Sequence, residues 1–335
     1  MIEKEFKLIN EQIELLKSRN LKFLNESICE KNLYTYGYYE IVNGYKFFLL
    51  DETITKERNE DWYKEDSYFE QIFARFILDK KIRNSILDAT LEIECSLRSA
   101  IAYVIARNFG HKENDYLIKT HYNKGKATKD DYGNVKFYKI DQIFEKFTNI
   151  LNDDVQPIKH YRDIHGNVPP WILLKGATFG NLVNFLKLQK ADLKNEILSI
   201  MSGREKNDFN NNDQLKSFYI DMIFLIHKFR NRAAHTGRMY NYSPKESEVS
   251  YFREFHEEMG ISRNAYSTGT RGKSDLATLY YGIEKFANFN AHFQLDFSLN
   301  WNISAHLKEF PDDEKMLLSG MGFDENFRIK DYSKN

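Results

Sequence analysis

Residues suited to acid–base and phosphate chemistry gather in one stretch of the chain. His227, Asn231 and His235 follow one another at steps of four residues, with Arg230 and Arg238 beside them. An imidazole can transfer protons near neutral pH, a guanidinium can hold two phosphate oxygens while staying charged, and an amide can orient either group. Together these groups could cleave a phosphodiester without a metal ion.

The same stretch predicts an amphipathic α-helix over about residues 214–237. Its apolar residues recur at steps of three and four: Phe218, Met222, Leu225, Ile226, Phe229 and Ala233. This period places them on one stripe of a helix, which should face a core. Thr236 and Gly237 provide a C-terminal stop, so the helix should present its cations and its amide near its end.

A simpler interpretation needs no chemistry. Arg230 and Arg232 could be solvated surface residues, and His235 could be a histidine placed favourably at the negative end of the helix dipole. On composition alone we favour this second interpretation.

Resemblance to a known family favours the catalytic interpretation of these residues. Arg230, Asn231 and His235, with four residues between the arginine and His235, resemble the Arg-x(4-6)-His motif of HEPN-domain ribonucleases. Further stretches resemble the Abi-like (AbiD/AbiF) branch of that superfamily, bacterial proteins of abortive phage infection. These stretches are residues 37–45 (GYYEIVNGY), 91–99 (LEIECSLRS), 169–171 (PPW) and 178–182 (TFGNL). They occur in the order of the family and span roughly residues 30–240.

The resemblance implies a mechanism. His235 would act as general acid or base on the ribose 2′-hydroxyl or the leaving 5′-oxygen, and Arg230 would stabilise charge on the phosphate. Asn231 would orient His235 or the phosphate, while Arg232 and Arg238 would hold neighbouring phosphates. The expected products are a 2′,3′-cyclic phosphate and a 5′-hydroxyl, with no metal or other cofactor. DNA lacks the attacking hydroxyl and should survive.

The resemblance also implies partners. HEPN ribonucleases usually bring two motifs together across an interface, and only Arg230 and His235 satisfy the spacing here, so we expect a homodimer. A toxic nuclease needs restraint, and a noncoding RNA, as an antitoxin or a guide-like partner, is one candidate. Two alternatives stay open: a non-catalytic RNA-binding or scaffold module, and a toxin silenced by a nucleotidyltransferase that modifies Tyr240 or Tyr242.

Two further groups of residues are expected to support the site. Glu94 and Arg98 stand four residues apart, where opposite charges meet on a helix. They form either a modest surface pair or, as the resemblance implies, a buried pair that positions the motif helix. Lys124, Lys126 and Lys129 lie in a stretch without apolar period, which predicts a basic loop or small hairpin. Their charges are either solvated or in contact with RNA phosphates.

Composition predicts a mainly α protein. Among 335 residues, 42% are hydrophobic, only 5 are proline, and long stretches show helical period. The resemblance implies a HEPN-like helical bundle with a helical N-terminal elaboration and a C-terminal extension. We expect an Abi-like HEPN domain over residues 1–240 and a helical extension over residues 241–335.

Charge and cysteine usage narrow the function classes. A formal net charge of -1 argues against a generally basic nucleic-acid coat, so an RNA site must be focal. Cys29 and Cys95 show no CxxC or Cys/His spacing, so neither a disulfide framework nor a zinc site is indicated, and both are expected to be small core residues. No run of about 18 apolar residues occurs and no signal pattern opens the chain, so we expect a cytoplasmic protein without membrane contact.

Overall fold

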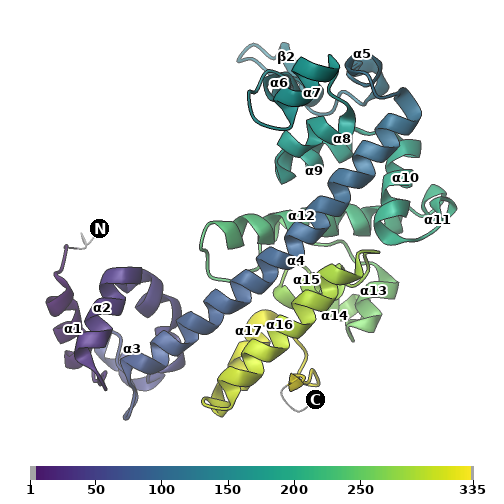
Figure 1. Cartoon of the computed structure of the whole chain (residues 1–335). Coiled ribbons are helices and arrows are strands. Elements are labelled where there is room, and N and C mark those ends of the chain that lie inside the picture. The colour runs from purple at the N-terminus through teal and green to yellow at the C-terminus, as the bar shows by residue number, and fades with distance from the viewer. Residues whose placement is uncertain (1–4, 333–335) are drawn as a thin grey trace. The chain divides into compact units, whose positions relative to one another are not determined.

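The computed structural model describes residues 5–332 and is 66% helical with 3% strand, which confirms the predicted mainly α class. Figure 1 shows its elements in chain order. Residues group into two compact units that alternate along the chain: residues 1–85, 236–241 and 297–335 form the first, and residues 86–235 and 242–296 the second. The predicted boundary at residue 240 stays a prediction. No helix in the described part of the chain is long and apolar enough to cross a membrane.

The first unit holds the helices of both ends of the chain. They are α1 (Ile9–Ser18), α2 (Glu26–Tyr36), η1 (Tyr39–Asn43), η2 (Lys46–Phe48), α3 (Glu52–Arg58), the first part of α4 (Phe69–Phe109), the last part of α16 (Phe289–Leu307), η6 (Pro311–Asp313) and α17 (Glu314–Met321).

A buried carboxylate organises the short segment 236–241 within this unit. Asp79 on α4 is 1% exposed and accepts hydrogen bonds from the backbone N–H groups of Met239 at 3.1 Å and Tyr240 at 2.7 Å. The ring of Tyr240 then packs on Tyr45, with 5.9 Å between centroids. The segment that follows the motif helix is therefore fixed to α4 and to the block at residues 37–45.

A second buried cluster ties α4 to the C-terminal helices. Arg75 donates to Asp313 at 2.6 Å, and His306 Nε2 lies 2.8 Å from the other oxygen of the same carboxylate. Arg75 and Asp313 are each 5% exposed. The guanidinium also faces the ring of Phe310, 5.5 Å from its centroid. Such a cluster is tolerated inside a protein because its charges are paired and hydrogen-bonded.

The second unit contains the rest of α4 and the elements around the motif helix. They are α5 (Glu113–Tyr116), η3 (Lys119–His121), β1 (Ala127–Lys129), β2 (Val135–Tyr138), α6 (Lys139–Leu151), α7 (Ile158–His165), α8 (Pro170–Leu173), η4 (Leu174–Gly176), α9 (Phe179–Leu188), α10 (Ala191–Ser202), α11 (Lys206–Asn210), α12 (Asp213–Ala234), η5 (Lys245–Ser247), α13 (Arg253–Glu258), α14 (Arg263–Thr268), α15 (Leu276–Ile283) and the first part of α16. Strands β1 and β2 pair antiparallel.

Helix α12 is the predicted motif helix. All six residues of its predicted apolar stripe are buried. The Asn212 side chain caps its first turn by accepting from Leu215 N at 2.9 Å. On the buried side α15 comes so close that a Cβ at Gly282 would lie 1.9 Å from the end of Met222, so a larger residue there would force the Met222 side chain to move. The helix ends at Ala234, three residues earlier than predicted, and Thr236 rather than Gly237 takes the left-handed conformation, with φ 59°.

The two cysteines differ in burial. Cys29 is buried, as predicted, whereas Cys95 is exposed and that prediction was wrong. The reason is its place on α4: Ile93 and Leu97, each two residues away, are fully buried. Two residues turn a helix by about 200°, so Cys95 lies on the opposite face.

Replacing Asp313 by Asn should destabilise the fold by about 3 kcal/mol, because Arg75 would stay buried without its counter-charge. Burial alone would raise the pKa of Asp313, but hydrogen bonds from His306 and Arg75 outweigh it and lower that pKa below its ordinary value of 3.8. The carboxylate therefore stabilises the fold above that value, and this stabilisation is lost as pH falls through the lower pKa of the folded state.

Urea unfolding at several pH values measures this effect. The gap in unfolding free energy between the wild type and Asp313→Asn should be full near neutral pH and shrink only in strong acid. The matched control is Asp312→Asn, an exposed neighbour on the same turn, which should behave like the wild type. A gap that does not change down to the acid limit would contradict the assignment.

Candidate active site at the end of helix α12

Arg230 is held by a buried carboxylate. Its Nε lies 3.2 Å from Oε2 of Glu94, and Arg98 donates from Nη2 to the other oxygen of Glu94 at 2.8 Å. The side chain of Glu94 is 7% exposed, against 24% for Arg98 and 29% for Arg230. Arg230 Nε and Glu94 Oε2 form no well-aligned hydrogen bond, so charge attraction rather than directional bonding joins them. One carboxylate thus serves two guanidiniums, and the cluster keeps one positive charge.

Arg98 extends this cluster to the turn before α9. Its Nε donates to the carbonyl oxygen of Leu174 in η4 at 3.1 Å. Three separate elements, α4, η4 and α12, therefore meet through Glu94 and its two partners. The interpretation of Glu94 and Arg98 as a plain surface pair does not describe this geometry, because Glu94 is buried. Their role in positioning a catalytic residue stays a prediction.

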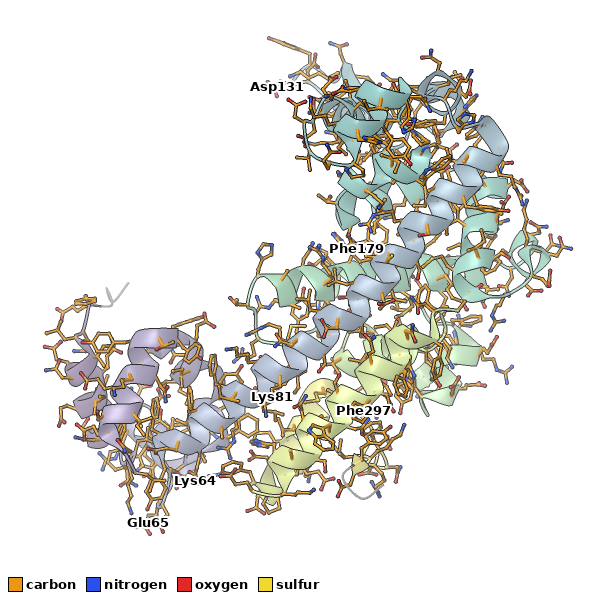
Figure 2. The ribbon with its side chains drawn as sticks, viewed as in Figure 1. Lys64, Glu65, Lys81, Asp131, Phe179 and Phe297 are labelled. Carbon is orange, nitrogen blue, oxygen red and sulfur yellow. The ribbon has the colours of Figure 1, made fainter. Side chains whose placement is uncertain are left out.

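The block at residues 178–182 packs against the same helix. Thr178 caps α9 by accepting from Asn181 N at 3.2 Å. Phe179, labelled in Figure 2, meets the ring of His227 edge-on with 5.3 Å between centroids. A Cβ at Gly180 would lie 3.2 Å from Nε2 of His227, which is tighter than ordinary contact. Glycine therefore lets α9 approach the polar face of α12.

His227 opens the row of residues at steps of four that continues with Asn231 and His235, but the sequence pattern assigned no role to it. Asn231 donates from its amide nitrogen to Nε2 of His227 at 2.9 Å. Burial, with the nearby charges of Lys228 and Arg230, lowers the pKa of His227. The ring is therefore neutral at pH 7 and accepts from the amide. The resemblance implied that Asn231 orients His235 or the phosphate; the structure pairs its amide with His227, and the role at the phosphate stays a prediction.

His235 stands just beyond the last helical residue and is exposed. Its backbone N–H donates to the carbonyl of Asn231 at 3.1 Å, and its imidazole has no hydrogen-bond partner within residues 5–332. It stands five positions after Arg230, a step of about 140° on an ideal helix, and its own backbone, with φ −101° and ψ 29°, has left the helical conformation. Helical phase alone therefore does not bring Arg230 and His235 of one chain to one face.

The other arginines near the motif have partners. The exposed Arg232 lies over the ring of Tyr242, 5.3 Å from its centroid. In the first unit, Arg238 donates to the carbonyl oxygen of Gly44 at 2.6 Å. Tyr240 is only 3% exposed, whereas Tyr242 is half-buried. Of the two tyrosines that a modifying enzyme could use, Tyr242 is thus the accessible one.

The predicted RNA-binding lysines lie on the β1–β2 hairpin and its approach. Lys124, Lys126 and Lys129 are all exposed. The hairpin packs on α6, where the backbone N–H of Lys139 donates to the carbonyl of Lys126 at 3.0 Å. The structure therefore anchors these charges to α6, with no direct tie to the Glu94 cluster.

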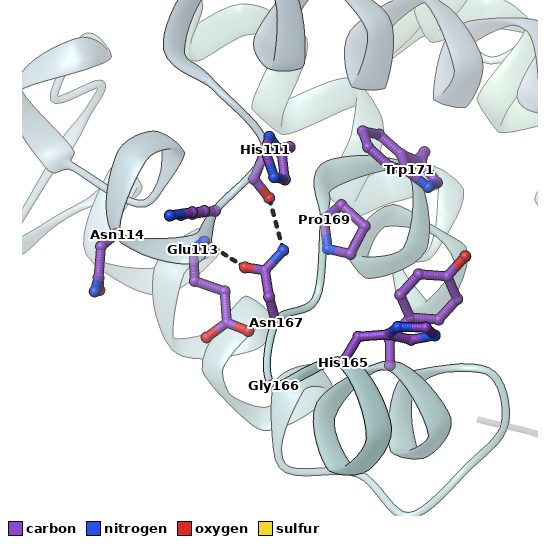
Figure 3. A pocket seen from close by; sticks show the side chains of 10 residues that line it. His111, Glu113, Asn114, His165, Gly166, Asn167, Pro169 and Trp171 are labelled. Carbon is purple, nitrogen blue, oxygen red and sulfur yellow. Dashed lines mark hydrogen bonds between the residues drawn. The ribbon is translucent and has the colours of Figure 1, made fainter.

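None of Arg230, Asn231 and His235 lines the hollow drawn in Figure 3. That hollow has a volume of about 570 Å³ and lies between α5, α7 and α8, with His111, Glu113, His165, Asn167 and Trp171 among its lining residues. Within residues 5–332, no three His, Cys, Asp or Glu side chains are grouped so that they could hold a metal ion.

Comparison with known proteins identifies the family. No curated protein and no solved structure matches the chain. The protein family described as Abi-like protein matches residues 31–241, which is more than half of the chain. The matched segment includes the block at 37–45, the Glu94 cluster, the turn before α9 and the whole of α12. The chain therefore belongs to the Abi-like protein family.

Proposed function

We propose that this chain is a metal-independent endoribonuclease of the HEPN type that acts as a toxin in abortive infection. Membership of the Abi-like family suggests a role in abortive infection or phage defence. The observation that carries the nuclease proposal is the fixed guanidinium of Arg230 on the helix that ends at the exposed imidazole of His235.

Arg230 is suited to hold a phosphate. Glu94 faces its Nε, while no hydrogen bond within residues 5–332 uses either of its Nη groups. Two parallel N–H donors of a guanidinium match two phosphate oxygens, and this geometry stabilises charge that builds up during the reaction. Because Arg98 and Arg230 share one carboxylate, the site keeps the positive charge that an anionic substrate needs.

His235 would supply the proton transfers. In the proposed reaction the ribose 2′-oxygen attacks phosphorus and loses its proton to a base, and the bond to the 5′-oxygen breaks as that oxygen takes up a proton. The products are a 2′,3′-cyclic phosphate and a 5′-hydroxyl. An exposed imidazole at a helix end can reach either oxygen and can act as acid or base at neutral pH.

The angle between the two residues supports a dimeric enzyme. Positions five apart on an ideal helix differ in direction by about 140°, so we expect Arg230 and His235 of one chain not to meet at the same phosphate. In a twofold dimer, Arg230 of one copy would face His235 of the other, and each pair would form one site. Asn231 would hold a phosphate oxygen or set the site through His227, and Arg232 would bind a flanking phosphate.

The activity of the proposed nuclease would be restrained by an RNA partner. A noncoding RNA that binds the same cations without being cut would act as an antitoxin, and the proposed setting is the cytoplasm, where cellular and phage transcripts are present. The alternative, a module that binds RNA without turnover, predicts stoichiometric binding and no new RNA ends.

Replacing Arg230 or His235 by Ala should each lower RNA cleavage by about 10²–10⁴-fold, because the first removes charge stabilisation and the second the proton transfer. The measurement is incubation of the purified full chain with total RNA in EDTA, followed by sequencing of the RNA ends. DNA of the same sequence should stay intact.

The matched control is Arg253→Ala, which removes an arginine that is 79% exposed on α13 and should cleave like the wild type. Circular dichroism should show all three variants folded. Cleavage at the wild-type rate by both Arg230→Ala and His235→Ala would rule the mechanism out.

Glu94→Gln should leave the fold intact but lower kcat by up to about 10²-fold, because Arg230 would lose the charge that fixes its guanidinium. As Glu94 touches no substrate in this mechanism, KM should change little. Glu92→Gln is the matched control, since Glu92 lies on the same helix and faces Asn288. An equal loss in both variants, or a loss only in KM, would argue against a positioning role for Glu94.

A further inference from the structure

Trp171 is exposed within a stretch that is otherwise part of the core. Its side chain is 45% exposed, whereas Ile172 and Leu173, which follow it, are 6% and 1% exposed. Pro170 occupies the first position of α8 and fixes the backbone there. Tryptophan is enriched at interfaces, where one part of its ring is apolar and the other reaches solvent.

The ring of Trp171 has no stacking partner. Arg58 lies over Trp62 at 3.9 Å, and Phe297 stacks on Trp301 at 6.0 Å between centroids. Across residues 5–332, no aromatic ring and no cation stacks on Trp171. No ring or cation within the described residues therefore competes for the exposed part of this side chain.

Two hollows meet at this tryptophan. The first, of about 570 Å³, carries the rings of His111 and His165 around Pro169 (Figure 3). The second, of about 380 Å³, is lined by Arg98 and Lys175 as well as Trp171. We call the surface formed by these two hollows the Trp171 groove.

Charge in the Trp171 groove favours an anion. Lys112 and Lys175 are exposed and form no ion pair within residues 5–332, and Arg98, which shares Glu94 with Arg230, also lines the groove. The lining holds one acidic residue, Glu113, whose Oε1 accepts from the backbone N–H of Val168 at 2.8 Å, so its cations outnumber its anions. Cations beside an unstacked aromatic ring are the features with which proteins hold single-stranded nucleic acid.

We propose that the Trp171 groove binds a single-stranded segment of RNA, with one base stacked on Trp171 and its phosphates near Lys175 and Arg98. This proposal rests on the proposed nuclease function and names its substrate class. Duplex RNA keeps its bases stacked inside the helix, so its bases cannot reach the tryptophan. Arg98 also holds Glu94, the partner of Arg230, so the groove shares a side chain with the cluster at the candidate active site.

The test measures binding in the absence of cleavage. The full chain carrying His235→Ala is titrated, in EDTA, against fluorescein-labelled oligouridine of about 20 nucleotides, a length that covers a typical single-strand site, and against a labelled RNA duplex of the same length. Fluorescence anisotropy gives both affinities. Adding Trp171→Ala should weaken binding to the single strand by about 5- to 100-fold and leave duplex binding unchanged.

Three further variants test the interpretation of this result. Trp171→Phe retains a ring and should keep most of the affinity. Lys175→Gln should weaken binding and flatten its salt dependence. Tyr34→Ala removes a tyrosine that is 71% exposed on α2 and should change nothing. Thermal unfolding of each variant shows whether the fold is kept.

The outcomes separate this proposal from the nuclease mechanism. Unchanged single-strand affinity in Trp171→Ala, an equal loss for single strand and duplex, or no RNA binding at all would overturn the groove proposal, and the last result would point to a protein segment as the ligand. RNA cleavage that persists without an effect of Trp171 refutes the groove alone. Binding that depends on Trp171 in a chain that never cleaves RNA refutes the nuclease alone.

Discussion

The candidate site depends on one buried carboxylate that faces two guanidiniums. Removing Glu94 from water is costly, and the cost is offset because Arg98 and Arg230 neutralise it from two sides. In return, charge attraction keeps Arg230 beside Glu94, while its outer nitrogens make no hydrogen bond within residues 5–332. The same contact joins α4, η4 and α12, so the geometry of the site is set by the packing of three elements rather than by the motif alone.

Close approach of backbones sets where α12 lies. Gly282 admits Met222 on the apolar side of the helix, and Gly180 admits His227 on its polar side. A Cβ at Gly282 would displace the end of the Met222 side chain, and a Cβ at Gly180 would stand 3.2 Å from His227 and crowd its ring. The second contact explains in physical terms why a glycine stands in the block at residues 178–182: it brings α9 against the pair formed by His227 and Asn231.

Helical period predicted the class of the fold, the motif helix and its buried stripe, because these depend on local spacing. It could not predict contacts made across the chain. Spacing placed Asn231 equally near His227 and His235, and only the approach of α9 shows which histidine is buried beside the amide. The spacing of Glu94 and Arg98 fits a surface pair and a buried one alike. Trp171 was recognised only as part of a family block, because its exposure depends on hollows built by residues far from it in sequence.

The central claim is that two copies of the chain complete each other's site, one supplying Arg230 and the other His235. In the most direct test, the two inactive variants Arg230→Ala and His235→Ala are mixed, unfolded and refolded together, so that chains of the two kinds can pair. Half of the resulting dimers would be mixed, and one of the two sites in each would be intact, so about a quarter of the wild-type cleavage should return. A mixture as inactive as its components, in dimers shown to have exchanged, would contradict the account.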